Sequence, residues 1–207
     1  KIKQLIILNN DGNLVLNSIL KMYPNVEDLQ IKFPNETIKE LRHRINNTSV
    51  RFLKLENTKY YLDNYDKFLR LTKLELIKLE TPPEQNLTLD NRPFLKEVII
   101  RDCAFQTITI KSKTLDLIEI SNTRNSNTKI KLEGFSQTLV LEDIAPKQTG
   151  ELIEIATGKK FKVNTCKISH CIISSLDTNN FLAQLNLKKS KSKKYPQNTL
   201  ILSFNTF

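Results

Sequence analysis

The fold is decided by V-R-F-L-K-L at residues 50–55 and by its counterpart L-T-K-L-E-L, which begins 21 residues later at residues 71–76. Both stretches fit the pattern L-x-x-L-x-L, in which the apolar side chains of a short strand share one side. A polar segment separates the two stretches. This arrangement predicts a solenoid in which each unit adds one strand to a parallel sheet and returns along the opposite side.

The same frame can be followed along the whole chain. Apolar triplets begin at positions 2, 26, 50, 71, 95 and 115, with steps of 24, 24, 21, 24 and 20 residues. Leucine-rich repeats have periods of about 20–29 residues. Later units begin at 136, 163, 182 and 197, where Ser136 and Gln197 replace the first apolar residue. We therefore expect a single leucine-rich-repeat domain over residues 1–207, with about nine to ten irregular repeats.

The return segments differ between the two halves of the chain. Residues 14–23, 37–45 and 60–69 have apolar residues at helical spacing, which predicts short helices. Residues 105–110 and 130–132 instead alternate apolar and polar side chains, which predicts strands. The expected fold is an α/β solenoid, a leucine-rich-repeat horseshoe with a parallel sheet on its concave side. Its convex side should be helical early and extended late.

Two motifs suggest a family. The stretches Y-P-N-V-E-D-L at residues 23–29 and R-P-F-L-K-E-V at residues 92–98 place a proline just before the strand. In this the chain resembles the irregular leucine-rich repeats of fungal and protist F-box proteins. It departs from the usual pattern after the strand, where asparagine is replaced by Leu79, Cys103, Thr123 and Ile144. The resemblance implies a protein-recognition scaffold, such as one arm of a larger adaptor, and similar repeats occur in kinetochore proteins.

The candidate partner site is the concave face, where the residues flanking the second leucine of each strand should point outward. Exposed apolar residues on such a face would form a stripe among charges, which is typical of a binding surface. Phe52→Glu or Ile99→Glu should then weaken partner binding and leave the fold intact. The predicted partner-binding residues are Phe52, Lys54, Glu75, Ile77, Glu97, Ile99, Leu117, Glu119 and Val140.

Positive charge gives an alternative function. Lysine and arginine number 32 against 22 acidic residues, a net charge of +10. Half of this excess lies in a basic loop, residues 188–196, which is a solvated loop, a nuclear-localisation signal or a phosphate-binding patch. The alternative function is therefore the binding of an acidic partner or of nucleic acid, as in a kinetochore-type or chromatin-type subunit. The lysines concerned are Lys188, Lys189, Lys191, Lys193 and Lys194.

The cysteines and histidines of the chain are its candidate zinc ligands. Cys166, His170 and Cys171 lie within six residues, but the frame directs both cysteines into the core and His170 away from them. The other histidine, His43, stands between two arginines. We therefore expect no metal site.

No motif indicates an enzyme. The four glycines are isolated, and no serine or cysteine stands in a nucleophile context with a histidine. We expect a non-catalytic protein without a cofactor.

The cellular setting is inferred from composition. The odd, low cysteine count of three favours a reducing compartment, so we expect an intracellular protein, cytoplasmic or nuclear. No apolar run is long enough to span a bilayer, so we expect no membrane partner. Because the chain begins with Lys1, we expect it to be part of a longer protein. The sequence does not indicate its oligomeric state.

Overall fold

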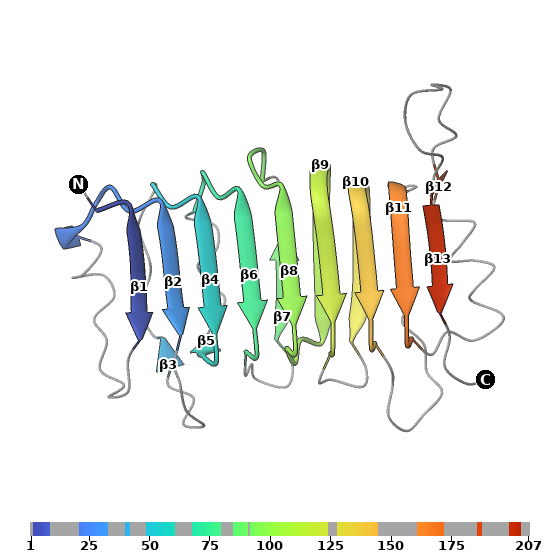
Figure 1. The fold of residues 1–207 in the computed structure, drawn as a ribbon, viewed down its shortest axis with the longest axis horizontal. Coiled ribbons are helices and arrows are strands. Elements are labelled where there is room, and N and C mark those ends of the chain that lie inside the picture. Colours follow the sequence, from blue (N-terminus) through green and yellow to red (C-terminus); the bar gives the residue numbers. More distant parts are fainter. Residues whose placement is uncertain are drawn as a thin grey trace.

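The structure is a computed structural model that describes residues 2–8, 21–32, 40–41, 49–60, 68–79, 85–90, 92–123, 128–144, 161–171, 186–187 and 199–203. Its main feature is one long sheet of parallel strands, ordered β1-β2-β4-β6-β8-β9-β10-β11 (Figure 1). These strands are β1 (Gln4–Leu8), β2 (Asp28–Lys32), β4 (Phe52–Glu56), β6 (Lys73–Ile77), β8 (Glu97–Arg101), β9 (Thr107–Ser121), β10 (Lys129–Glu142) and β11 (Lys162–Ser169).

The strands pair in the register of the sequence frame. The middle apolar residues of successive units lie side by side, so that Leu53 pairs with Leu29 on one neighbour and with Leu74 on the other. The same column continues through Val98, Ile118, Leu139 and Cys166. All of these side chains are fully buried, whereas Leu5, which pairs with Leu29 from the edge strand β1, is only partly buried. The predicted parallel solenoid is confirmed.

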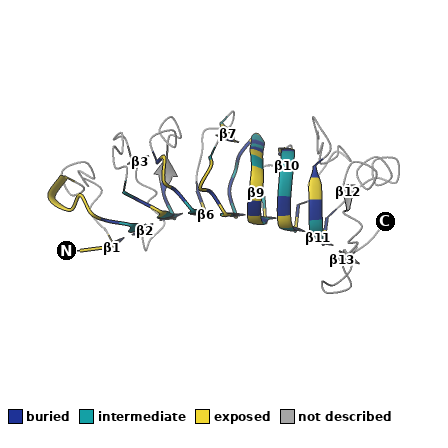
Figure 2. Ribbon diagram, turned by 90° about the horizontal axis from the view of Figure 1, so that it is seen from above, coloured by how far each residue is buried: buried dark blue, intermediate teal, exposed yellow. Residues whose placement is uncertain are grey.

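A second sheet layer closes the core in the later units. The short strand β7 (Asn86–Leu89) pairs in parallel with the first part of β9, which pairs with the first part of β10. In Figure 2, β7 lies opposite the long sheet, across the core. Every second residue of this layer is buried and completes the core, while the intervening residues are at least partly exposed. The buried residues of this layer are Leu87, Leu89, Ile108, Ile110, Ile130 and Leu132. The prediction of an extended return in the later units is confirmed.

The prediction of helices in the early units is wrong at the described residues of the second and third segments, 37–45 and 60–69. Glu40 and Leu41 form a strand, β3 (Glu40–Leu41), which pairs in parallel with β5 (Lys59–Tyr60). Helical backbone in the described residues is confined to Lys21 and Met22, and residues 14–20 of the first predicted helix lie outside them. Short segments with helical spacing have therefore formed strand pairs, because neighbouring units offer backbone partners that a short isolated helix lacks. The α/β mixture is replaced by a β-solenoid.

The last units also differ from the frame. Strands β12 (Asn186–Leu187) and β13 (Thr199–Ser203) both lie beside β11, where Leu187 pairs with Val163 and Leu200 with Cys166. The unit expected to begin at residue 182 would have placed Leu187 beside Ile168, so Leu187 is not in the expected register. Residues 188–198 are inserted between two strand segments that share one neighbour.

Strands β2, β6 and β8 are each entered through a similar hydrogen-bonded turn. Pro24 and Pro93 stand second in turns closed by the N–H of Val26 donating to Tyr23 and that of Leu95 donating to Arg92. Proline favours this position because its ring fixes φ near −65°. The prolines that carried the family resemblance therefore shape the turns before strands β2 and β8.

Strands β4, β6, β8, β9, β10 and β11 are each followed by a residue with a left-handed backbone. Its N–H donates to a carbonyl at the end of the next strand in the first five cases, over distances from 2.9 to 3.1 Å. Asparagine and aspartate adopt this conformation most readily after glycine. The column, which we call the corner column, is Asn57, Lys78, Asp102, Asn122, Asp143 and His170, with φ between 49° and 56°.

Within the ranges that the structure describes, no helix has the length and apolar character needed to span a membrane.

Candidate functional site

The outer face of the long sheet carries all nine predicted partner-binding residues. Side chains alternate along each strand, so the residues between the buried columns point away from the core. Eight of the nine are partly exposed, whereas Ile99 is only 6% exposed. The expected continuous apolar stripe is not formed, because the apolar residues fall in different rows on successive strands.

Most charges on strands β4, β6 and β8 of this face are paired, either within one strand or with the next strand. Lys54 Nζ lies 3.5 Å from Glu56 and 3.6 Å from Glu75, and Lys73 Nζ lies 3.0 Å from both Glu75 and Glu97. A further pair joins Glu56 to Lys32 at 2.9 Å. These six residues form an ion-pair ladder across strands β2, β4, β6 and β8. The ladder satisfies its own charges, so Lys54, Glu75 and Glu97 are not isolated anchors for a partner.

The ladder shifts two pKa values. Partial burial alone would raise the pKa of Glu56, but hydrogen bonds and charge attraction from Lys32 and Lys54 outweigh it and lower that pKa. The pKa of Lys73 is raised, chiefly because its ammonium group donates to Glu97, with Glu75 adding to the effect. Both shifts favour the charged forms, which is what holds the ladder together.

Phe52 is packed into this charged surface. Lys73 Nζ lies 5.4 Å from the centre of the Phe52 ring, within the range of a cation–π contact. The ring is therefore partly covered by a neighbour. It is less accessible to a partner than the sequence suggested.

Ile99 is enclosed between two acidic neighbours. Its register partners are Glu75 on β6 and Glu119 on β9. Arg101 donates to both carboxylate oxygens of Glu119, a paired geometry that fixes the planar guanidinium group beside Ile99. This pairing raises the pKa of Arg101. The low exposure of Ile99 makes it part of the packing of the face.

A neutral area adjoins the ion-pair ladder on the next strands. Leu117 on β9 pairs with Thr138 on β10, and Val140 lies one row further along β10 between Glu119 and Lys167. All three side chains are half-buried. We call Leu117, Thr138 and Val140 the neutral patch. Ile77 lies apart from it on β6, between Glu56 and Arg101.

The basic run from Lys188 to Lys194 lies outside the described residues. The same applies to His43. The contact of these lysines with phosphate stays a prediction from the sequence alone.

The cysteines lie where the frame placed them. Cys103, Cys166 and Cys171 are buried free thiols. Burial raises the pKa of Cys166 to about 12 and that of Cys171 to about 11. His170 is exposed, whereas both thiols are buried, which agrees with the predicted directions of the three side chains. The thiolate form needed for zinc binding is therefore strongly disfavoured at these two cysteines.

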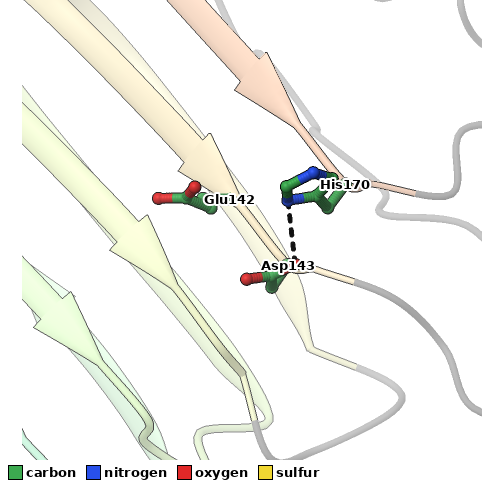
Figure 3. Close-up of side chains that lie close together, drawn as sticks. All are labelled: Glu142, Asp143 and His170. Atoms are coloured by element: carbon green, nitrogen blue, oxygen red, sulfur yellow. Dashed lines mark ion pairs between the residues drawn. The ribbon is translucent and has the colours of Figure 1, made fainter. Parts of the chain in front are cut away.

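The sequence interpretation missed a cluster beside His170. The ligand atoms of Glu142, Asp143 and His170 all lie within 4.8 Å of one another at the ends of β10 and β11 (Figure 3). His170 Nδ1 lies 3.3 Å from Asp143 Oδ1. Imidazole and carboxylate groups at this spacing can share a metal ion or form an ion pair.

The repeat frame contains the signal that would have found this cluster. Asp143 and His170 occupy the same slot in successive units, seven residues after frame positions 136 and 163. Residues in one slot of neighbouring units stack on one another in a solenoid. Reading the slots as columns, rather than reading each strand separately, brings the two side chains together.

Comparisons of the chain with protein-family models, with curated proteins and with solved structures found no match.

Proposed function

We propose that this chain is a non-catalytic protein-recognition scaffold of the leucine-rich-repeat type, and that its partner binds the outer face of the long sheet. The observation that carries the proposal is the neutral patch. Leu117, Thr138 and Val140 are half-buried on adjacent strands of a rigid sheet, next to charges that are already paired. A fixed surface of this kind loses little conformational entropy when a partner binds.

The ion-pair ladder supports a role in specificity. Its charges lie beside the neutral patch rather than within it, which corresponds to the polar rim and less charged centre of protein interfaces. Rim charges affect partner choice and association rate more than final affinity. The partner is therefore expected to bring an apolar centre to Leu117 and Val140, with charged groups around it.

The pairing of the carboxylates supports a non-catalytic role. On strands β4, β6, β8 and β9, each outward glutamate of the described chain lies against a lysine or an arginine. A general acid–base pair needs carboxyl groups with separated pKa values near a substrate. The pKa of Glu56 is instead lowered, because Lys32 and Lys54 favour its ionised form over the opposing effect of burial.

The test is affinity capture from a lysate of the source cells, at low and high salt, with four forms of the chain. The wild type and the Thr109→Glu variant should retain the same protein at high salt, whereas Leu117→Glu and Val140→Glu should lose it. Thr109 is a matched control because it faces outward from the opposite layer of the same strand as Leu117.

Two outcomes would overturn the proposal. Equal capture by all four forms would remove the neutral patch from the interface. Retention of nucleic acid that disappears at high salt, and also after neutralisation of Lys188–Lys194, would support the alternative of a nucleic-acid-associated subunit, since phosphate binding weakens steeply with salt.

A further inference from the structure

His170 and Asp143 already have the spacing of two ligands on one metal ion. The distance from His170 Nδ1 to Asp143 Oδ1 is 3.3 Å. Two ligand atoms about 2.1 Å from a tetrahedral Zn²⁺ ion lie about 3.4 Å from each other. The two side chains therefore require little movement to hold an ion between them.

The backbone keeps these two residues in place. Both belong to the corner column, with φ of 49° for Asp143 and 53° for His170. The N–H of Asp143 donates to the carbonyl oxygen of Ser169 at 3.1 Å, which ties the end of β10 to the end of β11. The relative position of the ligands is thus set by the stacking of two units.

Glu142 carries a third group of the kind that binds metal ions. Its carboxylate lies within 4.8 Å of the ligand atoms of Asp143 and His170, and it reaches them by rotation of a partly exposed side chain. The ion pairs of the described residues include none for Glu142, whereas the glutamates of the ion-pair ladder have lysine partners. Two carboxylates beside one imidazole leave excess negative charge, which favours a divalent cation.

Ser169 gives an independent indication that a ligand binds here. It is 4% exposed, and its Oγ atom has no hydrogen-bond partner in the described structure. Ser169 pairs in register with Glu142, so its side chain faces the same side of the sheet, and it directly precedes His170. A buried hydroxyl without a partner costs free energy, and a metal-bound water or a metal-bound carboxylate beside it would accept its hydrogen bond.

We propose that Glu142, Asp143 and His170 form a binding site for a divalent transition-metal ion of the zinc class, with Ser169 as a hydrogen-bonding neighbour of the ligands. An imidazole nitrogen with two carboxylates suits Zn²⁺ better than Mg²⁺ or Ca²⁺, which prefer ligand sets made only of oxygen. Three protein ligands leave a fourth position for water. The ion links the ends of β10 and β11, and this role is independent of the proposed partner site.

The experiment is a calorimetric titration of the full chain with Zn²⁺ alone, followed by the same titration of five variants. We expect one ion per chain, with affinity at least about 10-fold lower in Glu142→Gln, Asp143→Asn and His170→Asn. Asparagine is used at the two corner positions because it tolerates the left-handed backbone. The matched controls are Glu97→Gln, a carboxylate on the same face, and His43→Asn, the other histidine, and both should bind as the wild type does.

A second measurement does not depend on variants. In the unmodified chain, Zn²⁺ should shift the imidazole ¹⁵N resonances of His170 and leave those of His43 unchanged. Circular dichroism would confirm that each variant is folded. The proposal is overturned if Zn²⁺ shows no saturable binding, if the three ligand variants bind as tightly as the wild type, or if the shift occurs at His43 alone.

Discussion

The carbonyl oxygen of Ser112 occupies the space that a Cβ atom on Gly134 would need. The two residues pair across β9 and β10 where both strands bend between the two sheet layers, and the register shifts directly afterwards. Gly134 has φ of 104°, a conformation that residues with a side chain rarely adopt. The bend of β10 therefore depends on glycine at this position.

Gly134→Ala should destabilise the fold. Backbone strain at an unfavourable φ costs about 1–3 kcal/mol, and the overlap with Ser112 adds to this. The measurement is the free energy of unfolding in urea. Lys131→Ala, three residues earlier on the same strand, is the control and should change stability by less than about 0.5 kcal/mol. Equal stability of the two variants would contradict the predicted close approach.

Lys78→Asn should stabilise the protein. Lys78 has φ of 53° in the corner column, where Asn57 and Asn122 stand in other units. A left-handed backbone costs most residues about 1–2 kcal/mol, and asparagine less. We expect a gain of about 0.5–1 kcal/mol, seen as a rise in Tm of roughly 1–4 °C. The same change at Lys167, inside strand β11, should lower Tm, and a fall at both positions would show that Lys78 has another role.

The sequence predicted the inward columns of the fold because two constraints agree there. The period-two alternation of each strand and the recurrence of the frame both place Leu53, Leu74 and Val98 in one column, and the structure confirms this. The early return segments carry only one constraint, a helical spacing over a few residues. Strand pairing between β3 and β5 outweighed that spacing.

The candidate sites were predicted less well because they depend on side-chain neighbours. The outward direction of the Ile99 side chain followed from the alternation of side chains along its strand. Its burial, however, depends on neighbours from three strands, Glu75, Glu119 and Arg101. The displaced last unit shows a related limit. Apolar offsets alone do not reveal that residues 188–198 interrupt the alignment of two strand segments with β11.

Ile99→Glu should unfold or strongly destabilise the protein, in contrast to the expectation from the sequence. The new carboxylate would be nearly buried between Glu75 and Glu119, so desolvation and charge repulsion act together. We expect a loss of roughly 2–4 kcal/mol in urea denaturation. Val140→Glu is the matched variant and should lose less stability than Ile99→Glu, because its register neighbour Lys167 can pair with the new charge. A loss below about 1 kcal/mol at Ile99 would mean that this face is more open than described.

The thiols of Cys166 and Cys171 should resist alkylation in the native protein. Their pKa values of about 12 and about 11 lie well above the ordinary value of 9.0, because burial disfavours the thiolate. At pH 8, labelling by iodoacetamide should be at least about 100-fold slower than in 8 M urea, since the thiolate is the reactive form. Because unfolding lowers both pKa values, stability should fall as pH rises above 9.0. Rapid native labelling at both sites, read by mass spectrometry, would place these thiols at the surface.

Glu56 should contribute to acid sensitivity. Its folded-state pKa lies below the ordinary value of 4.5 because the ion pairs with Lys32 and Lys54 outweigh burial. The stabilisation is therefore fully present above pH 4.5 and is lost as pH falls through the lower folded-state pKa. Glu56→Gln should reduce the slope of unfolding free energy against pH on the acid side. Lys32→Met should move the pKa of Glu56 upward, as followed by NMR of its carboxylate carbon, because it removes the shortest ion pair of that residue. The prediction fails if Glu56→Gln leaves the acid slope unchanged and Lys32→Met leaves the pKa of Glu56 unchanged. The ion pairs of Glu56 would then not form in solution.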